Sequence, residues 1–448
     1  MQRLAGLPLQ ARRRLATEIF LVTHRTRLLL TLLVWAVACC LALPAAASNP
    51  PQRKNKPKIV KQPAAMVKAA SDQGEVRLIA IYQLIGQGKS RQALTLAEAL
   101  VRDHPNFQLA QLVLGDLLSA QTRPVRRLGD VPDAAAQDGA SVLADLRDES
   151  QQRLKALRER PVAGTIPAAF VSLSVRNRHA IAVDASRSRL YLFENKGGVL
   201  SLIADYYISL GKTGVEKSTE GDLRTPLGVY FVTSNLDPKS LRDFYGSGAL
   251  PINYPNPFDL RRGKTGSGIW LHGTPPNQFS RAPRATDGCV VMANSDLTHL
   301  VKTVEIRTTP VVIAQNLVWT TPQSLIAPAR SFEASLDAWR RAKSSGNVER
   351  VRSFYTADFS GNGKPLADWL PGLQRDIERA AGKEVLLKDL SLLRYPEPQE
   401  TMVVTFGELL AGTQKGVVRR QYWTRDADPY RATANDSGWK IFFEGVIG

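Results

Sequence analysis

The chain has 448 residues, a formal net charge of +18 and only three cysteines. This length is that of two or three domains rather than one, and so few cysteines exclude a fold that depends on a disulfide framework. The positive charge favours an anionic neighbour such as a cell-wall polymer or lipid headgroups, although general solubility explains it equally well.

The N-terminal segment has the composition of a secretory signal. Arginines precede an apolar run of about 16 residues, short of the ~20 that a membrane span requires, and alanines at positions 45–47 close the run. We therefore predict a signal peptide over residues 1–47 and a periplasmic protein; an uncleaved membrane anchor is the alternative. Nucleic acid is not an expected partner of an exported chain. Cleavage would remove Cys39 and Cys40 and leave Cys289 alone.

Residues 48–73 are rich in proline and lysine, which predicts a flexible basic linker. From residue 74 to 160 the apolar residues recur at helical spacing, with breaks at 86–88 and 104–106. This pattern resembles tetratricopeptide hairpins, with about one and a half repeats. Because such arrays usually need three or more repeats to be stable alone, we expect the region to pack on a neighbour or to mediate a contact.

The pattern changes to alternating apolar residues and Gly/Asn/Ser turns over residues 178–316, which predicts a mostly-β domain. A short helix is expected after Ser295. Residues 317–330 are predicted to be a second linker. Residues 331–448 show helices first and four strand-like runs afterwards, an α+β pattern. The expected fold is therefore multidomain: α-helical, then mostly β, then α+β.

Cys289 and His272 are the candidate catalytic pair of the β domain. A lone thiol in an oxidising compartment raises the expectation of chemistry, and a cysteine nucleophile needs a base and oxyanion donors. His272 follows the apolar run "GIWL" and precedes Gly273, where it can face a cleft. Gly288 lets a substrate approach the backbone, and the amides of the turn at 287–289 could hold an oxyanion. A structural thiol and a surface imidazole are the alternative.

The same stretch resembles the YkuD-type L,D-transpeptidases of bacterial cell walls. The family signature is a His-Gly pair, a loop of about fifteen residues and a Ser/Thr-x-Gly-Cys turn, here His272-Gly273 and Thr286–Cys289. The upstream family element is matched by Gly211-Lys212 and by "TPLGVY" at 225–230. The resemblance implies a Cys289 nucleophile, a His272 proton acceptor and donor, and a thioester formed with a peptidoglycan stem peptide.

Two positions depart from the common family pattern. Asp287 stands where a second histidine is usual, and Val291 where an arginine is frequent. The stretch "DGCVVMAN" is similar to the corresponding stretch of a YafK-like subgroup. This resemblance implies a hydrolysis reaction that releases lipoprotein from peptidoglycan. We commit to L,D-transpeptidation, with that hydrolysis as the alternative and a non-catalytic wall-binding scaffold as the third possibility.

Further site residues are expected around this pair. Lys212, Arg281 and Arg284 could meet the carboxylates of stem peptides, although a solvated basic loop is the plainer interpretation. Arg284, Thr286 and Tyr254 are predicted to bind substrate, although Tyr254 is equally well explained as an ordinary turn aromatic. Asp287 could orient His272 or merely hold its turn, and we favour the turn. The scattered histidines and one cysteine of the mature chain are too few for a zinc site, and no cofactor is expected. The C-terminal part resembles the NTF2/SnoaL-like cone and is interpreted as accessory.

Overall fold

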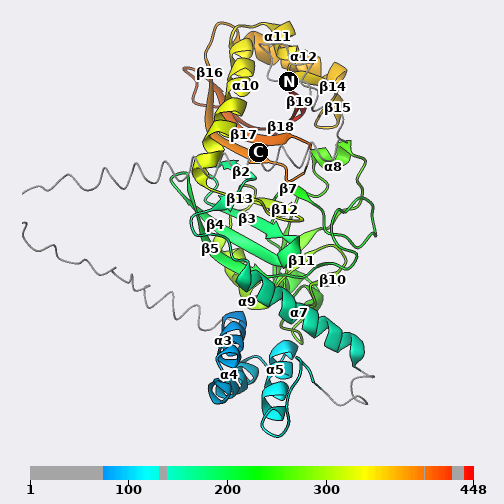
Figure 1. Ribbon diagram of the computed structural model, residues 1–448. Helices are drawn as coiled ribbons and strands as arrows, with labels where there is room; N and C mark the ends of the chain where they lie inside the picture. The colour runs from blue at the N-terminus through cyan, green and yellow to red at the C-terminus, as the bar shows by residue number, and fades with distance from the viewer. Residues whose placement is uncertain (1–73, 131–138, 398, 426–437, 448) are drawn as a thin grey trace, which may run out of the picture. The chain divides into compact units, whose positions relative to one another are not determined.

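The computed structural model describes residues 74–130, 139–397, 399–425 and 438–447 (Figure 1). The predicted signal peptide and basic linker, including Cys39 and Cys40, lie outside the described residues. Among the described helices, none combines the length and the apolar character that a membrane crossing requires.

Helices form the first part of the described chain, as predicted. They are α3 (Gly74–Gly86), α4 (Ser90–Asp103), α5 (Gln108–Ser119) and α7 (Ala140–Arg158). In α4 the buried residues Ala93, Ala97 and Leu100 recur every three or four positions, so one face of the helix packs inward. The likeness to tetratricopeptide hairpins remains a prediction. We call residues 74–158 the helical region.

The core of the helical region includes side chains from the β domain. Phe279 and Ala293 join its buried cluster, which contains Leu78, Ile81 and Phe107. The region therefore does not bury its apolar face by itself, and the expectation that it packs on a neighbour is met.

A five-stranded sheet forms the centre of the β domain, in the order β5-β4-β3-β12-β7. Its strands are β3 (His179–Asp184), β4 (Arg189–Lys196), β5 (Val199–Tyr207), β7 (Gly228–Phe231) and β12 (Pro310–Ala314). Strand β12 runs parallel to β3 and antiparallel to β7. Side chains alternate between the faces of a strand, so Ile181 and Val183 enter one core while Ala180 and Ala182 enter another.

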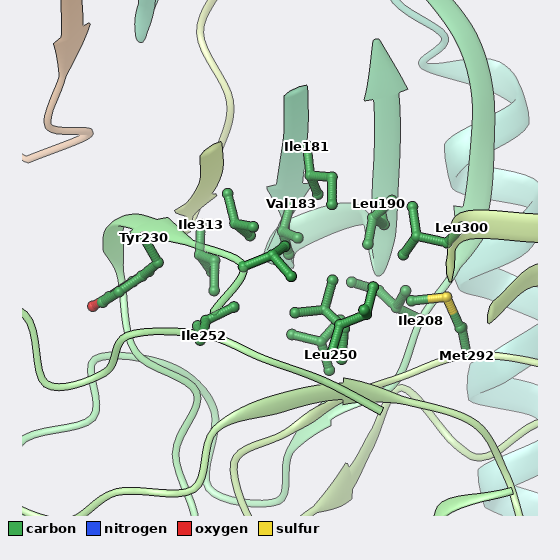
Figure 2. Packing of buried hydrophobic residues seen from close by; sticks show 14 of the residues in the cluster. Ile181, Val183, Leu190, Ile208, Tyr230, Leu250, Ile252, Met292, Leu300 and Ile313 are labelled. Carbon is green, nitrogen blue, oxygen red and sulfur yellow. The ribbon is translucent and has the colours of Figure 1, made fainter. Parts of the chain in front are cut away.

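The first of these cores lies between the five-stranded sheet and the elements that carry the candidate site (Figure 2). Those elements are β6 (Leu210–Gly211), β8 (Ala249–Pro251), β9 (Trp270–His272), β10 (Arg284–Thr286), β11 (Val290–Val291) and α9 (Asn294–Thr303). The short helix α8 (Pro257–Arg261) instead contributes Phe258 to the other core. Strands β11, β9 and β8 form one small sheet, and β10 pairs with β6. Leu250, Leu271 and Val290 anchor the small sheet in this core, which fixes the strands on which the candidate residues lie.

The second core is shared with the C-terminal part of the chain. Phe193 and Phe231 of the five-stranded sheet pack in one cluster with Leu393, Tyr422 and Phe442. In addition, β2 (Phe170–Ser172) precedes the β domain in sequence but pairs with β16 of the C-terminal sheet. The C-terminal part is therefore joined to the β domain by a continuous apolar interface.

The C-terminal part has the predicted α+β composition. Its helices α10 (Ile326–Ser344), α11 (Val348–Arg352) and α12 (Leu366–Ala380) pack against a seven-stranded sheet in the order β15-β14-β19-β18-β17-β16-β2 (Figure 1). The remaining strands are β14 (Tyr355–Gly361), β15 (Lys364–Pro365), β16 (Val385–Arg394), β17 (Thr401–Leu410), β18 (Val417–Arg425) and β19 (Trp439–Val446). The assignment to the NTF2/SnoaL-like cone remains a prediction.

The segment 317–330 is structured, in contrast to the linker predicted there. Strand β13 (Trp319–Thr320) pairs with β1 (Ile166–Pro167), and α10 begins at Ile326. Trp319 also makes an edge contact with Tyr191, with ring centroids 5.0 Å apart. The proline- and threonine-rich composition suggested a flexible connection, but these tertiary contacts hold the backbone in place.

Candidate active site

Strand register brings Cys289 and His272 to the same face of the small sheet. Strands β11 and β9 are parallel, with Val290 opposite Leu271 and Val291 opposite His272. Cys289 is therefore in register with Trp270, two residues before His272. Opposed residues of parallel strands, and residues two apart along a strand, point to the same face. Both candidate side chains line one cavity of about 480 Å³.

The turn before Cys289 is held by threonine hydroxyls. The Thr286 hydroxyl accepts from the Gly288 amide (3.1 Å) and donates to the Cys289 carbonyl oxygen (2.7 Å). The Thr225 hydroxyl donates to the carbonyl oxygen of Gly288 (2.9 Å). Gly288 has a φ of +125°, and a Cβ there would lie 2.7 Å from the Arg224 carbonyl oxygen. Glycine is thus required by the backbone, and its amide, predicted as part of an oxyanion turn, is already bonded to Thr286.

The imidazole of His272 is buried and oriented by the main chain. Its Nδ1 lies 2.7 Å from the Gly273 carbonyl oxygen. Because a carbonyl oxygen can only accept, Nδ1 carries the proton and Nε2 has the free lone pair. Burial, together with the charge of Arg281, lowers the pKa of His272 to about 4 despite the Gly273 bond. The ring is therefore neutral near pH 7 and can accept a proton.

The residues after His272 are packed closely by Asn294. A Cβ on Gly273 would lie 2.1 Å from Asn294 Oδ1, and the Asn294 amide donates to the Thr274 carbonyl oxygen (2.8 Å). The same Oδ1 accepts from the Ser247 amide (2.8 Å). Asn294 therefore fixes two loops of the cavity, a role that its place at the start of α9 did not reveal.

Cys289 has a free thiol whose pKa is raised. Burial is the main cause, and it outweighs the Trp270 backbone hydrogen bond and the positive charges of Arg281 and Lys217, which act in the opposite direction. A raised thiol pKa and a lowered imidazole pKa both favour the neutral pair. A cysteine paired with histidine commonly has a lowered thiol pKa. Here the direction is reversed, because burial disfavours the charged form of both groups.

Phe244, Tyr245 and Arg242, which the sequence did not single out, line the cavity together with Arg281, one of the cations expected to meet carboxylates. The Tyr245 ring lies 5.0 Å from the His272 ring, and Phe244 lies 5.8 Å from it. The guanidinium groups of Arg281 and Arg242 lie over Phe244 and Tyr245, at 4.6 and 5.9 Å. The short segment "RDFYGSG" at 242–248 supplies Arg242, Phe244 and Tyr245 to the cavity wall. Its two adjacent aromatics, followed by two glycines, were the available signal.

Some charged residues of the cavity form ion pairs and others do not. Lys217 pairs with Asp222 (2.8 Å), and Asp287 pairs with Lys212 (2.9 Å). Within the described part of the chain, neither Arg242 nor Arg281 forms an ion pair, although both line the cavity. An anionic group of a ligand would therefore find two guanidinium groups beside Cys289.

Two predicted substrate residues lie elsewhere. Tyr254 is 5% exposed and packs in the domain core, where its hydroxyl donates to the Thr265 carbonyl oxygen (3.1 Å). Arg284 is exposed on β10 and is not among the residues that line the cavity. Neither residue lines the cavity, so the substrate-binding role given to them stays a prediction. Of the cations expected to meet carboxylates, Arg281 lines the cavity, whereas Arg284 and Lys212 are not among the lining residues.

Asp287 does not orient His272. Its carboxylate accepts from Lys212 Nζ, and both side chains are more than half exposed. The imidazole is oriented by Gly273, and the turn by Thr286, as described above. The described residues show no hydrogen bond between Asp287 and His272, and the turn is held by the neighbouring Thr286. Both Thr286 and Asp287 line the cavity.

Comparison with known proteins finds relatives of the β domain. The family model of the L,D-transpeptidase catalytic domain (YkuD) matches residues 178–313. The structure of Bd1075 from Bdellovibrio bacteriovorus is similar over 63% of this chain and 98% of that chain, with 25% sequence identity and a TM-score of 0.52. The helical cell shape determining protein Pgp2 from Campylobacter jejuni shares the fold over 66% of this chain and 99% of that chain, with 21% identity and a TM-score of 0.50. No curated protein matches the chain.

Proposed function

We propose that the YkuD-type domain of residues 178–313 is a cysteine acyltransferase of peptidoglycan stem peptides, with L,D-transpeptidation as its reaction. The family match supports a peptidoglycan-acting, L,D-transpeptidase-like role. The observation that carries the finer proposal is the lone pair of a neutral, main-chain-oriented His272 in the cavity that Cys289 also lines. This arrangement has the parts of a thiol–base pair.

In the proposed mechanism, His272 Nε2 removes the Cys289 proton as the sulfur attacks a stem-peptide carbonyl. The carbonyl is the one on the L-centre of the diaminopimelate residue. A C–S bond forms, and the C–N bond to the terminal D-alanine breaks when His272 returns the proton to the leaving amine. An acceptor amine then attacks the thioester, gives a proton to His272, and forms the new amide as the thiol is regenerated.

Arg242 and Arg281 are proposed to bind the carboxylates of the stem peptide. Both guanidinium groups line the cavity, and both are held against aromatic rings, which limits their movement. A carboxylate that accepts from guanidinium gains a charge-assisted hydrogen bond. The same groups would favour the substrate over a neutral peptide, because a neutral peptide leaves the cations unpaired.

Hydrolysis of the same thioester is the second candidate function. The favouring observation is again the pair Arg242 and Arg281, since two cations beside the thioester repel a protonated amine acceptor but not water. Asp287 could attract that amine, but its carboxylate is already paired with Lys212. The product of hydrolysis would be a shortened stem peptide, or a released lipoprotein if a protein is the leaving group.

Export and physiological setting belong to the same proposal. A signal peptide over residues 1–47 would deliver the domain to the periplasm, where its substrate lies. Pgp2, which has the same fold, is a helical cell shape determining protein, and remodelling of the wall that affects cell shape is the setting we propose. A non-catalytic scaffold remains the competing possibility and predicts no covalent chemistry at Cys289.

The decisive experiment supplies tetrapeptide muropeptides to the purified protein, with and without an amine acceptor, and measures products by mass spectrometry. Cys289-dependent 3–3 cross-links or D-amino-acid exchange would support transfer. Tripeptide alone would establish the hydrolase instead. If neither product forms and a thiol-reactive carbapenem leaves folded protein unlabelled at Cys289, the scaffold is the correct interpretation.

A further inference from the structure

The loop that carries Arg281 is attached to the helical region as well as to its own domain. Within the β domain, the Tyr207 and Ser209 hydroxyls donate to the carbonyl oxygens of Arg281 and Ala282 (2.8 and 2.6 Å). Residues 273–283 connect β9 to β10, and near their centre Phe279 enters the helical core with only 8% of its surface exposed. Its ring stacks on Phe107, with centroids 4.1 Å apart and planes at 21°, and meets the edge of His104 at 5.1 Å. A methyl group on Gly74 would lie 2.6 Å from the Phe279 ring. The helical core therefore packs tightly around this ring.

Main-chain hydrogen bonds fix the loop at the same point. The Phe279 amide donates to the Asn106 carbonyl oxygen (3.1 Å), and the Asn106 side-chain amide donates to the Pro276 carbonyl oxygen (2.9 Å). The loop and the α4–α5 connection thus bond to each other in both directions. A ring contact alone would permit rotation about its axis, whereas these bonds also set the direction of the chain.

The two residues after Phe279 connect this fixed part of the loop to the candidate site. The Ser280 hydroxyl donates to Glu149 of α7 (2.7 Å), and that buried carboxylate is itself held by Arg153 (2.7 Å). The following residue, Arg281, lines the Cys289 cavity and stacks on Phe244. Three consecutive residues therefore pass from the helical core, through an α7 contact, to the cavity.

We propose that the helical region holds Arg281 in its substrate-binding position through Phe279, so that Phe279 is a positioning residue for stem-peptide binding. The inference rests on the proposed function, in which Arg281 binds a substrate carboxylate. A loop without regular structure has many conformations, and fixing each of its residues costs conformational entropy. The helical region meets part of that cost before substrate arrives, in addition to the contacts within the β domain. Without the helical contact, the guanidinium would occupy the binding position for a smaller fraction of the time.

Steady-state kinetics on tetrapeptide muropeptides test the proposal in the full chain. Phe279→Ala is expected to raise KM about 10-fold or more, the loss of one charge-assisted hydrogen bond, while kcat stays within about 2-fold. Alkylation of Cys289 by iodoacetamide, a neutral reagent, should be unchanged. Gly74→Ala, which crowds the same ring from the helical side, should raise KM in the same direction, and Phe279→Leu should restore part of the affinity.

A double-mutant cycle separates positioning from general destabilisation. Phe279→Ala should add nothing to the KM of Arg281→Gln if Phe279 acts only through Arg281. Leu117→Ala, in the helical core but without a hydrogen bond or ring contact to the loop, is the matched control and should leave KM unchanged. Additive effects of Phe279→Ala and Arg281→Gln, or an unchanged KM for Phe279→Ala, would overturn the positioning role. An inactive wild-type protein would instead refute the proposed function.

Discussion

His272 donates its Nδ1 proton to the carbonyl oxygen of Gly273, the next residue in the chain, at 2.7 Å. The main chain thus performs the orientation that a third side chain performs in many nucleophile–base pairs. Asn294 packs against Gly273 and donates to the carbonyl oxygen of Thr274. The position of the imidazole therefore depends on the backbone of residues 272–274 and on the Asn294 side chain.

The first prediction concerns the thiol. Since burial raises the pKa of Cys289, the reactive thiolate is a small fraction near neutrality. Its alkylation by iodoacetamide should therefore rise about 10-fold per pH unit between about pH 7 and 9. Cys289→Ser provides the blank. A rate that reaches a plateau below about pH 8 would indicate a preformed thiolate–imidazolium pair and contradict the neutral pair described here.

The second prediction concerns the base. His272→Gln should lower acylation of Cys289 by a stem peptide by about 10²- to 10⁴-fold, the usual contribution of a general base. In the wild type the rate should not fall on the acid side until the pH approaches about 4, where His272 becomes protonated. His179→Gln is the control, because His179 bonds Glu305 (3.0 Å) and does not line the cavity. An equal loss in both variants would remove His272 from this role.

The third prediction compares two neighbours in the cysteine turn. Thr286→Val removes the hydroxyl that holds Gly288 and Cys289 and should cost about 1–3 kcal/mol of stability, with slower acylation because the thiol is misplaced. Asp287→Asn breaks only an exposed ion pair and should change stability by less than about 1 kcal/mol. Thr286→Ser keeps the hydroxyl and should behave like the wild type. Thermal unfolding and acylation rates, measured together, decide whether Asp287 matters more than its geometry indicates.

The fourth prediction concerns a buried carboxyl beside the helical region. Burial, aided by the negative charge of Glu75, raises the pKa of Asp296 from 3.8 to about 7. The folded protein binds this proton more tightly than the unfolded chain, so the stabilisation is complete below about pH 4 and is lost as the pH rises through about 7. Asp296→Asn should therefore gain stability relative to wild type between pH 5 and 8, by roughly 2–4 kcal/mol at about 1.4 kcal/mol per pH unit.

Thermal unfolding of Asp296→Asn and wild type across this pH range checks the sign. Asp148→Asn, an exposed change on α7, should show a constant difference from wild type. If the stability difference between Asp296→Asn and wild type narrows as the pH rises, Asp296 is charged in the folded protein across this range.

A fifth expectation concerns the boundary after the β domain. A chain that ends at Thr321 loses the partners of Phe193 and Phe231 in the second core and leaves β2 without β16. Exposing this apolar face should reduce the free energy of unfolding by more than the ~5–15 kcal/mol that is typical of a domain, so the truncated chain should unfold. Loss of the near-ultraviolet circular dichroism signal and rapid proteolysis would confirm the unfolding. A folded truncation that still reacts at Cys289 would instead show that the β domain is independent.

The sequence by itself determined the order of structural classes and the chemistry of the candidate site. Helical spacing, strand alternation and turn residues are local properties of the chain, so α3 to α7 and the strands of the C-terminal part were predictable. His272, Gly288 and Cys289 were identifiable because their residue types and spacing reflect what a thiol nucleophile requires.

Which side chains share the cavity, and what charge they carry, depends on tertiary structure. Of the three cations expected near the site, only Arg281 lines the cavity with Cys289, and Tyr254 belongs to the core, because packing cannot be deduced from residue type. The neutral state of His272 and Cys289 follows from burial, which depends on distant segments. The attachment of Phe279 to the helical region, and of β2 to β16, joins residues far apart in sequence, and no local pattern carries that information.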